Sequence, residues 1–221
     1  MAIVDEIAQL IGDKYVLQGE DAAQKNMEWG EHSSCQALAF VKPANTAELA
    51  AILKLCNASK QPVNIVAGLT NLVRATVCQP NEIALSVERL DAIEHIDTTE
   101  MTMTAGAGVL LQLAHDAASE AGLLFPWDIG ARGSCMLGGN LATNAGGTKV
   151  IRYGMARQSV LGLEVVLADG TVLSSLNRYL KNNSGVDLKQ LFIGSEGLYG
   201  VITKAVIALQ PKTSSCNVAF I

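Results

Sequence analysis

Apolar residues recur along this chain at two spacings, and each spacing predicts a different kind of element. Near the N-terminus the spacing is three to four residues, which is typical of an amphipathic helix; its apolar face holds Ile3, Ile7, Leu10 and Ile11. The stretch QALAFVKP predicts a short strand that ends at Pro43. Asn45 and Glu48 form a capping box for a following helix, whose apolar stripe is Leu49, Ile52, Leu53 and Cys56.

Three further apolar runs predict strands in the first half of the chain. PVNIV resembles a buried strand, and NEIALSVERL and MTMTAGAG are two more candidates bounded by turn residues. These strands would make a first small lobe. A second helix is expected from about Leu110 to Glu120, with Leu113, Ala114 and Ala117 facing inward and Gly122 as the left-handed residue that ends it.

The last third of the chain predicts a hairpin, a short helix and a long strand. LGLEVVLADGTVLSS contains two strand-like runs around a tight turn at Asp169 and Gly170. SGVDLKQLFIG then predicts a short helix, and VITKAVIAL a last long strand. Strands and helices thus alternate without any internal repeat, which indicates an α+β fold that divides near residues 100 to 106.

Composition and charge exclude several classes of function. The chain has 221 residues, of which 49% are apolar and 17% charged, as in a globular protein with a real core. The net charge of −5 argues against a nucleic acid partner, because phosphate binding requires a concentrated excess of Lys and Arg. No apolar run approaches the roughly 20 residues that span a bilayer, so we expect no membrane span and a cytoplasmic location.

The cysteine pattern indicates reduced thiols. The chain has five cysteines and no CxxC pair, so neither a disulfide framework nor a zinc site is predicted, and we expect no metal. The cysteines are Cys35, Cys56, Cys78, Cys135 and Cys216.

A glycine-rich stretch from Gly130 to Gly147, GARGSCMLGGNLATNAGG, carries the candidate chemistry. A backbone without Cβ atoms can approach a diphosphate closely and direct several N–H groups at it. Polar side chains that can bind phosphate or ribose oxygens stand between the glycines, namely Ser134, Asn140, Thr143 and Asn144. Arg152 lies nearby in the chain and could offset negative charge. The alternative is a structural loop that uses glycine for turns, but the length and the polar filling favour phosphate binding.

A second glycine pattern, GAGVLL from Gly106 to Leu111, follows a predicted strand and opens a helix, as a nicotinamide-dinucleotide fingerprint would. The third glycine is replaced by Leu111, and GLLFPWD follows the helix in place of a strand ending in an acidic residue. We therefore do not expect a nicotinamide site there.

Four blocks in a fixed order resemble a known family: DIGARGSCMLGGNLATNAGG, IRYGM, LGLEVVLADGTVL and DLKQLFIGSEGLYGVIT. Over about residues 30 to 221 the chain resembles the FAD-linked oxidases of the vanillyl-alcohol oxidase type. Within that family it is most similar to the D-2-hydroxyglutarate dehydrogenase branch, with D-lactate dehydrogenases and glycolate oxidase flavin subunits less similar. The resemblance implies a two-subdomain FAD-binding domain, and an oxidoreductase that converts a D-2-hydroxy acid to the 2-oxo acid by hydride transfer to FAD.

The resemblance also implies which residues hold the cofactor, through two loops and a later segment. The first loop supplies Ala67, Gly68, Leu69, Thr70, Asn71, Leu72 and Arg74. The second loop, with residues beside it, supplies Pro126, Asp128, Ser134, Gly138, Gly139, Asn140, Thr143, Asn144, Gly146, Gly147, Arg152 and Gly154. The residues expected near the adenine, ribose or ribityl part are Glu196, Gly197, Gly200, Val201 and Ile202.

The first loop departs from the family pattern. The family has a run like GGNTGLVGG, whereas this chain has AGLTNLVRA over residues 67–75. Left-handed backbone at Leu69, Asn71 or Ala75 would cost roughly 1 to 2 kcal/mol each. Arg74 could be a cationic partner for phosphate or a solvated surface cation, and both interpretations stay open. We expect FAD to bind, but weakly enough to be lost on purification, and without a covalent link, because the loop has no His and its nearest Cys is Cys78.

No residue in this chain is predicted to be the catalytic base, since His32, His95 and His115 are scattered over predicted surface segments. In the resembled family the substrate and metal-binding residues lie in a C-terminal domain. The expected segments are a helical lead-in (1–30), a first FAD-binding subdomain (31–105), a second (106–212) and the start of a missing substrate domain (213–221).

We therefore expect the isolated chain to be inactive, with a 2-hydroxy acid and an electron acceptor as partners engaged through the missing domain. An exposed apolar patch where that domain would pack could drive formation of a homo-oligomer. The alternative is a cofactor-free flavin-fold domain that serves as an interaction or structural module, and the altered first loop is its support.

Overall fold

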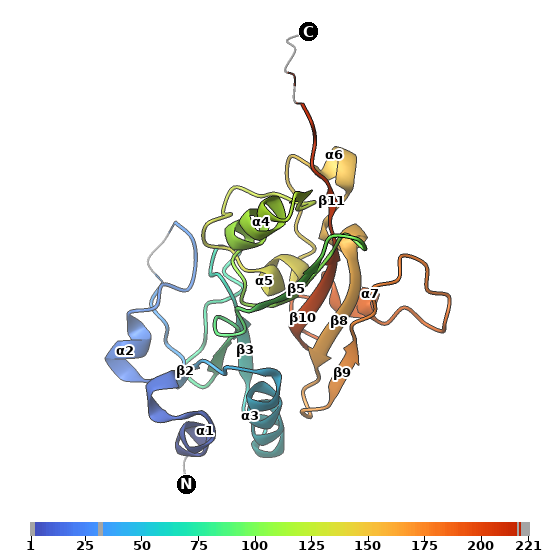
Figure 1. Cartoon of the computed structure of the whole chain (residues 1–221). Helices are drawn as coiled ribbons and strands as arrows, with labels where there is room; N and C mark the ends of the chain where they lie inside the picture. Colours follow the sequence, from blue (N-terminus) through green and yellow to red (C-terminus); the bar gives the residue numbers. More distant parts are fainter. Residues whose placement is uncertain (1–2, 31–32, 216, 218–221) are drawn as a thin grey trace.

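Two sheets form the two halves of the fold in the computed structural model, which describes residues 3–30, 33–215 and 217 (Figure 1). The first sheet has four strands in the order β1-β2-β4-β3. Strands β2, β4 and β3 run parallel, and β1 pairs antiparallel with β2. Their bounds are β1 Val16–Leu17, β2 Ala39–Val41, β3 Val63–Val66 and β4 Ile83–Ser86.

Helices α1 (Ile3–Ile11) and α3 (Thr46–Ser59) pack together beside this sheet (Figure 1). The short helix η1 (Asp13–Tyr15) contacts α1, and α2 (Gly19–Ala23) contacts β2. The predicted stripe of α3 is confirmed, because all four of its residues are buried. On α1 the expected face is partly wrong: Leu10 is 49% exposed and Val4 is buried instead. The helix turns Val4, Ile7 and Ile11 toward the core, since these positions share one face at the 3.6-residue period.

The predicted capping box is present at the start of α3. Asn45 Oδ1 accepts a hydrogen bond from Glu48 N at 2.9 Å. The Glu48 carboxylate accepts in return from Ala44 N at 2.7 Å, one residue earlier than the usual box. This cap fixes where the helix begins after β2.

The second sheet has five strands in the order β5-β6-β10-β8-β9, and every pairing in it is antiparallel. The bounds are β5 Ile93–Asp97, β6 Thr102–Gly106, β8 Val160–Val166, β9 Val172–Ser175 and β10 Val201–Ala208. A separate pair joins β7 (Leu123–Leu124) to β11 (Gln210–Pro211). The remaining helices are α4 (Leu111–Glu120), α5 (Leu137–Ala142), α6 (Val150–Tyr153), η2 (Ala156–Ser159) and α7 (Lys189–Phe192).

One strand assignment from the sequence is wrong. The MTMTAGAG strand was grouped with the first lobe, whereas β6 pairs with β5 and with β10 in the second sheet. Strand β5 was not predicted, because its sequence IEHID is short and polar. Sheet membership therefore changes between Ser86 and Ile93, before the expected boundary at residue 105. A local pattern cannot show that Gly106 lies opposite Lys204, since that pairing depends on a segment far along the chain.

The other predicted elements of the second half are present. Strands β8 and β9 form the expected hairpin, with Gly170 at φ 83° in its turn. Helix α4 and the left-handed Gly122 (φ 75°) are also where the pattern placed them. The inward face of α4 is partly wrong, however, because Leu113 is 51% exposed and the helix buries Leu111, Ala114 and Ala118.

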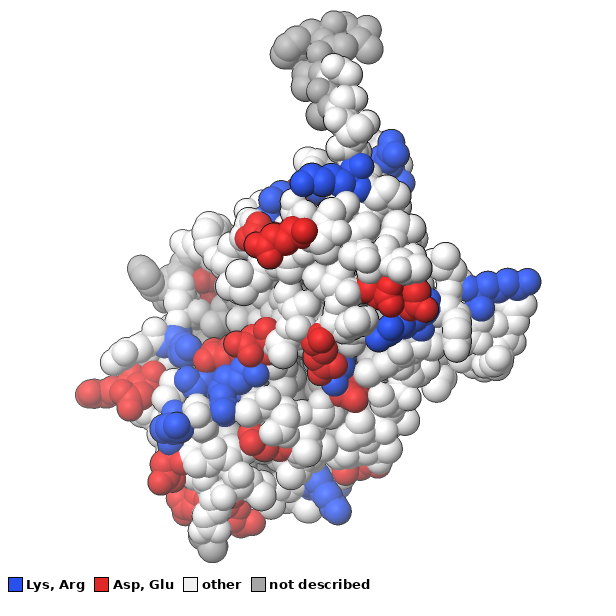
Figure 2. Space-filling model, viewed as in Figure 1, with Lys and Arg blue, Asp and Glu red and all other residues white. Residues whose placement is uncertain are grey.

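The surface gives no sign of a continuous basic patch on the face in Figure 2, where Lys and Arg are interspersed with Asp and Glu. The absence of a nucleic acid partner stays a prediction. Among the helices of the described residues, none combines the length and apolar character needed to cross a membrane.

Candidate functional site

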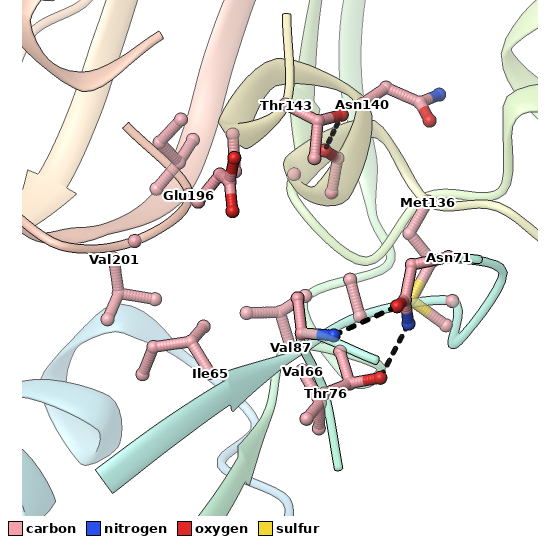
Figure 3. A pocket seen from close by; sticks show the side chains of 18 of the residues that line it. Ile65, Val66, Asn71, Thr76, Val87, Met136, Asn140, Thr143, Glu196 and Val201 are labelled. Carbon is pink, nitrogen blue, oxygen red and sulfur yellow. Dashed lines mark hydrogen bonds between the residues drawn. The ribbon is translucent and has the colours of Figure 1, made fainter. Parts of the chain in front are cut away.

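A cleft of about 700 Å³ opens between the two halves of the fold and is lined by three segments that are far apart in sequence. Strand β3 and the loop after it, residues 67–76, form one wall; residues 135–145 and 196–202 form the others (Figure 3). This volume lies within the range of 300 to 1,000 Å³ that is usual for small-molecule and cofactor sites. The cleft is therefore the candidate functional site.

Many of the predicted cofactor residues lie in the lining of this cleft. They are Ala67, Gly68, Leu69, Thr70, Asn71, Gly138, Gly139, Asn140, Thr143, Glu196, Gly197, Gly200, Val201 and Ile202. Other predicted residues lie outside the lining, namely Leu72, Arg74, Pro126, Asp128, Ser134, Asn144, Gly146, Gly147, Arg152 and Gly154.

The first loop contains two residues with strained backbone. Leu69, which stands where the family has Asn, has φ 52°, and Arg74, which stands where the family has Gly, has φ 59°. Asn71 and Ala75 are not left-handed. The Leu69 side chain packs against the buried cluster of Met27, Cys35 and Phe40, so apolar contact offsets part of its strain. Arg74 is exposed and outside the lining, in keeping with the solvated-cation interpretation.

Asn71 holds the first loop together through its side chain. Its Oδ1 accepts from Ala75 N at 3.1 Å and from Val73 N at 3.3 Å, and its Nδ2 donates to Thr76 Oγ1 at 2.6 Å. The Asn71 carbonyl also accepts from Trp29 N at 3.2 Å. Within the described residues, the amides of Gly68, Leu69 and Thr70 donate to no backbone carbonyl, so they are available to a ligand.

Glycines in the second loop allow close contact with other backbone segments. A Cβ on Gly147 would lie 1.8 Å from Asp128 O, and one on Gly138 would lie 2.6 Å from Ala107 Cβ. A Cβ on Gly68 would lie 2.3 Å from Ser134 O, which brings the first and second loops into contact. Several glycines that were predicted to approach a diphosphate are therefore required by packing within the protein.

Helix α5 begins inside the second loop with its first amides already bonded. Leu137 N donates to Val109 O at 2.9 Å, and Gly138 N donates to Ala107 O at 2.7 Å. The amide of Gly139, by contrast, donates to no backbone carbonyl outside the helix in the described part of the chain. A Cβ on Gly139 would approach Ala67 Cβ at 3.2 Å, so this position borders the first loop.

The polar side chains of the second loop have partners within the protein. Asn140 is 4% exposed and its Nδ2 donates to Cys135 Sγ at 3.6 Å. Thr143 Oγ1 donates to Gly139 O at 2.9 Å. Asn144, with φ 49°, accepts from Arg157 N at 3.1 Å. Of these three, Thr143 is the one whose hydroxyl is exposed and able to turn toward a ligand.

The third segment brings a carboxylate to the cleft. Glu196 has φ 56°, and its amide donates to Ala142 O at 2.8 Å, which ties the segment to α5. Glu82 lines the opposite wall, and no Lys or Arg lies among the described lining residues. An anionic ligand in this cleft would therefore rely on amides and hydroxyl groups.

An ionic cluster stands beside the second loop and includes a histidine. Asp128 accepts two hydrogen bonds from Arg132, and Lys149 Nζ lies 3.7 Å from Asp128 Oδ2. His115 Nε2 lies 2.9 Å from Trp127 O, and burial lowers the pKa of His115. The expected surface position of His115 is wrong, since its side chain is only 11% exposed. His95 is half exposed, as expected, and His32 lies outside the described residues.

The remaining predicted residues are placed as follows. Pro126 is buried, while Ser134 and Arg152 are exposed, with the Arg152 guanidinium 5.4 Å from the centre of the Tyr153 ring. Gly106 and Gly108, the alternative dinucleotide pattern, lie outside the cleft lining. A Cβ on Gly106 would lie 2.0 Å from Leu90 O, so close backbone packing accounts for that glycine.

The sequence analysis missed the apolar part of the lining. Ile65, Val87, Ile129, Met136 and Phe192 all border the cleft. No motif marks them, because buried apolar residues serve the core everywhere in the chain; only the position of β3 directly before the first loop could have suggested Ile65. Cys135 also borders the cleft, but it is 2% exposed, and burial raises the pKa of its thiol.

Comparison with known proteins agrees with this geometry. Residues 37–175 match the family model described as "FAD binding domain". "Probable D-2-hydroxyglutarate dehydrogenase, mitochondrial" of Oryza sativa subsp. indica is 43% identical over 220 residues, covering 99% of this chain and 39% of the relative. D-2-hydroxyglutarate dehydrogenase of Bos taurus, named mitochondrial, is 40% identical over 98% of this chain and 40% of the relative. That of Xanthomonas citri pv. viticola is 39% identical over 90% of this chain and 42% of the relative.

Since the family match spans more than half of the residues, the chain belongs to the FAD-binding domain family, and FAD is its cofactor. A solved structure of alkyldihydroxyacetonephosphate synthase has the same fold, with a TM-score of 0.83 at 19% identity over 96% of this chain and 41% of that one. The expected two-subdomain fold is confirmed. The chain spans about 40% of the length of these curated relatives.

Proposed function

We propose that this chain is the FAD-binding part of an oxidoreductase that converts a D-2-hydroxy acid, of the 2-hydroxyglutarate or lactate type, to its 2-oxo acid. The observation that carries the proposal is the similarity to D-2-hydroxyglutarate dehydrogenases, which extends over nearly all of this chain. Because the chain covers only part of those relatives, the whole reaction is assigned by similarity.

The cleft offers donor groups and an apolar lining that suit a dinucleotide of the FAD type. The uncommitted amides of Gly68, Leu69, Thr70 and Gly139 would hold the diphosphate, since oriented backbone N–H groups form anion-binding concavities. Thr143 would add a hydroxyl. The flat rings of the cofactor would lie against the apolar lining, and the backbone of residues 196–202 would contact the adenosine or ribityl part.

We propose that the cofactor is held noncovalently and is lost readily on purification. The described lining contains two carboxylates, Glu82 and Glu196, and no cationic side chain to offset the diphosphate charge. Cys135 is the only thiol in that lining, and its buried position, with a raised pKa, disfavours bond formation to a flavin. Left-handed Leu69 and Arg74 add strain where the family has other residues.

FAD, when bound, can accept a hydride from the carbon that carries the substrate hydroxyl. The residues of this chain would bind and orient the cofactor through amides, and Ile65, Val87 and Phe192 would exclude water from its rings. We assign no catalytic base to this chain: its described lining has no histidine or lysine, and no contact marks Glu82 or Glu196 as a base. The substrate carboxylate, the base and the electron acceptor would be engaged by a further domain, and we expect this chain alone to be inactive.

The test is reconstitution of the purified chain with excess FAD, followed by gel filtration in a column buffer that contains FAD and an absorption spectrum of the protein peak above the buffer level. Flavin absorbance that elutes with the chain is the expected result, with partial loss on dialysis. Full occupancy after dialysis would contradict weak binding. Protein without flavin after reconstitution would contradict cofactor binding by this chain and favour the interaction-module alternative.

Domain division, location and assembly are part of the same proposal. We keep the segments 1–30, 31–105, 106–212 and 213–221 as proposed units, although β5 and β6 join the second sheet. The cytoplasmic location is proposed from the sequence alone, whereas the plant and bovine relatives are named mitochondrial. Fluorescence microscopy of a tagged protein in its own cells would decide between the two locations, and light scattering would test for a homo-oligomer.

A further inference from the structure

The first loop reaches its shape by a different route from the family pattern described above. In GGNTGLVGG, glycines can take left-handed backbone at little cost. In AGLTNLVRA, Asn71 stands at one of those glycine positions, and its φ is not left-handed. Something other than glycine must therefore close this loop.

The carboxamide of Asn71 supplies that closure. It accepts from the amides of Val73 and Ala75, at 3.3 and 3.1 Å. It also donates to Thr76 Oγ1 at 2.6 Å (Figure 3). One planar group thus joins the backbone amides of two residues and the hydroxyl of a third within the loop. Since an amide side chain offers two acceptor sites and two donors, most of its capacity is used inside the loop.

The same pair of residues fastens the loop to a separate segment of the chain. Thr76 Oγ1 donates in a short hydrogen bond to Met27 O, and Trp29 N donates to Asn71 O at 3.2 Å. Met27 is fully buried in the cluster with Cys35 and Phe40, so the loop is tied to a packed part of the molecule. The loop cannot shift without breaking several hydrogen bonds at once.

This arrangement leaves the amides at the start of the loop uncommitted. Val73 and Ala75 donate to Asn71, whereas Gly68, Leu69 and Thr70, which line the cleft, donate to no backbone carbonyl among the described residues. Holding donors in place before a ligand arrives reduces the entropy lost on binding.

We propose that Asn71 is a positioning residue, with Thr76 as its partner: the Asn71–Thr76 pair holds the first loop ready for the diphosphate of FAD in place of the family glycines. The proposal rests on the binding of FAD in this cleft. It assigns Asn71 a role inside the loop, whereas the resemblance implied contact with the cofactor.

The test is a double-mutant cycle on FAD affinity, using the whole chain and the variants Asn71→Ala, Thr76→Val and the double variant. The dissociation constant is measured by quenching of FAD fluorescence. Each single variant should bind FAD about tenfold more weakly, the loss expected for one to two hydrogen bonds. The double variant should bind no more weakly than Asn71→Ala, because both residues act as one unit.

A second measurement separates positioning from general stability. Urea unfolding of the FAD-free variants should show midpoints near that of the unmodified chain, while hydrogen exchange at Val73 and Ala75 should accelerate in Asn71→Ala. Asn81→Ala, an exposed asparagine outside the cleft lining, is the matched control and should change neither affinity nor exchange.

The outcomes are distinguishable. An unmodified chain that binds FAD, together with an Asn71→Ala variant of unchanged affinity, would overturn the positioning role alone. Additive losses in the double variant, or weaker binding that follows a matching loss of stability, would also overturn it. If the unmodified chain itself binds no FAD, both the cofactor assignment for this cleft and the positioning role fail.

Discussion

The two loops that line the cleft keep their shapes by opposite means. In the second loop, glycines allow the backbone to lie directly against other backbone, as Gly147 does against Asp128 and Gly138 against Ala107. In the first loop, side chains stabilise the loop conformation. Asn71 and Thr76 form an internal hydrogen-bond network, and the side chain of left-handed Leu69 packs against an apolar cluster. A missing side chain and a well-placed side chain can therefore serve the same purpose.

The difference affects how each loop should respond to substitution. A glycine packed against backbone admits no Cβ, because neither neighbour can move without shifting a whole segment. In a loop held by side chains, the loss should be limited to the hydrogen bonds or apolar contacts that a substitution removes. The following predictions test this contrast, from the largest effect to the smallest.

Gly147→Ala should have the largest effect. Its Cβ would lie 1.8 Å from Asp128 O, and the expected loss of stability is about 3 kcal/mol or more. Gly133→Ala is the control in the same loop, since a Cβ there meets nothing within 4 Å. Urea unfolding measures both. Equal stability of the two variants would contradict the packing role of Gly147.

Asp128→Asn should have an intermediate effect. The change removes the carboxylate shared by Arg132 and Lys149 next to the second loop. Because the Arg132 side chain is 36% exposed, solvent screening limits the expected loss of stability to about 1 to 2 kcal/mol. Asp116→Asn, at an exposed position, should change stability by less than about 0.5 kcal/mol. A similar loss of stability in both variants would show that the ionic cluster around Asp128 does not stabilise the fold.

Leu69 allows the strain in the first loop to be measured. At most positions Gly is less stable than Ala, but at φ 52° the order should reverse, since only glycine avoids the left-handed cost. Leu69→Ala and Leu69→Gly both lose the side chain's apolar contacts, so their difference isolates the backbone. We expect the free energy of unfolding of Leu69→Gly to be about 1 kcal/mol higher than that of Leu69→Ala. The opposite order would mean that the loop relaxes around position 69.

The pH dependence of stability should show the smallest effect. Burial lowers the pKa of His115 below its ordinary value of 6.5, so the unfolded chain takes up a proton there before the folded chain does. Stability from this site is present above pH 6.5 and is lost as the pH falls toward the lowered value. Between pH 7.5 and 5.5 the unmodified chain should lose up to about 1 kcal/mol more than His115→Gln. Parallel pH curves would contradict this.

Local patterns in the sequence predicted most elements correctly. The 3.6-residue stripe of α3, the Asn45 cap and the Asp169–Gly170 turn depend on residues close together in the chain, so the sequence alone determines them. The resemblance carried by the four ordered blocks implied an FAD-binding fold, which the family match confirms. The departure of the first loop from the family pattern also led us to weigh a left-handed cost at Leu69, whose φ is 52°.

Only the tertiary structure decided which distant segments meet. It placed β6 beside β10 in the second sheet, turned Leu10 and Leu113 toward solvent, and buried His115 beside Trp127. It also showed that Gly147 faces Asp128 and that the Asn71 carboxamide closes its own loop. These outcomes depend on the packing of elements separated by many residues. The sequence determined the helices, strands and turns because the interactions that stabilise them join residues close together in the chain. The cleft forms only when segments far apart in the chain pack against each other.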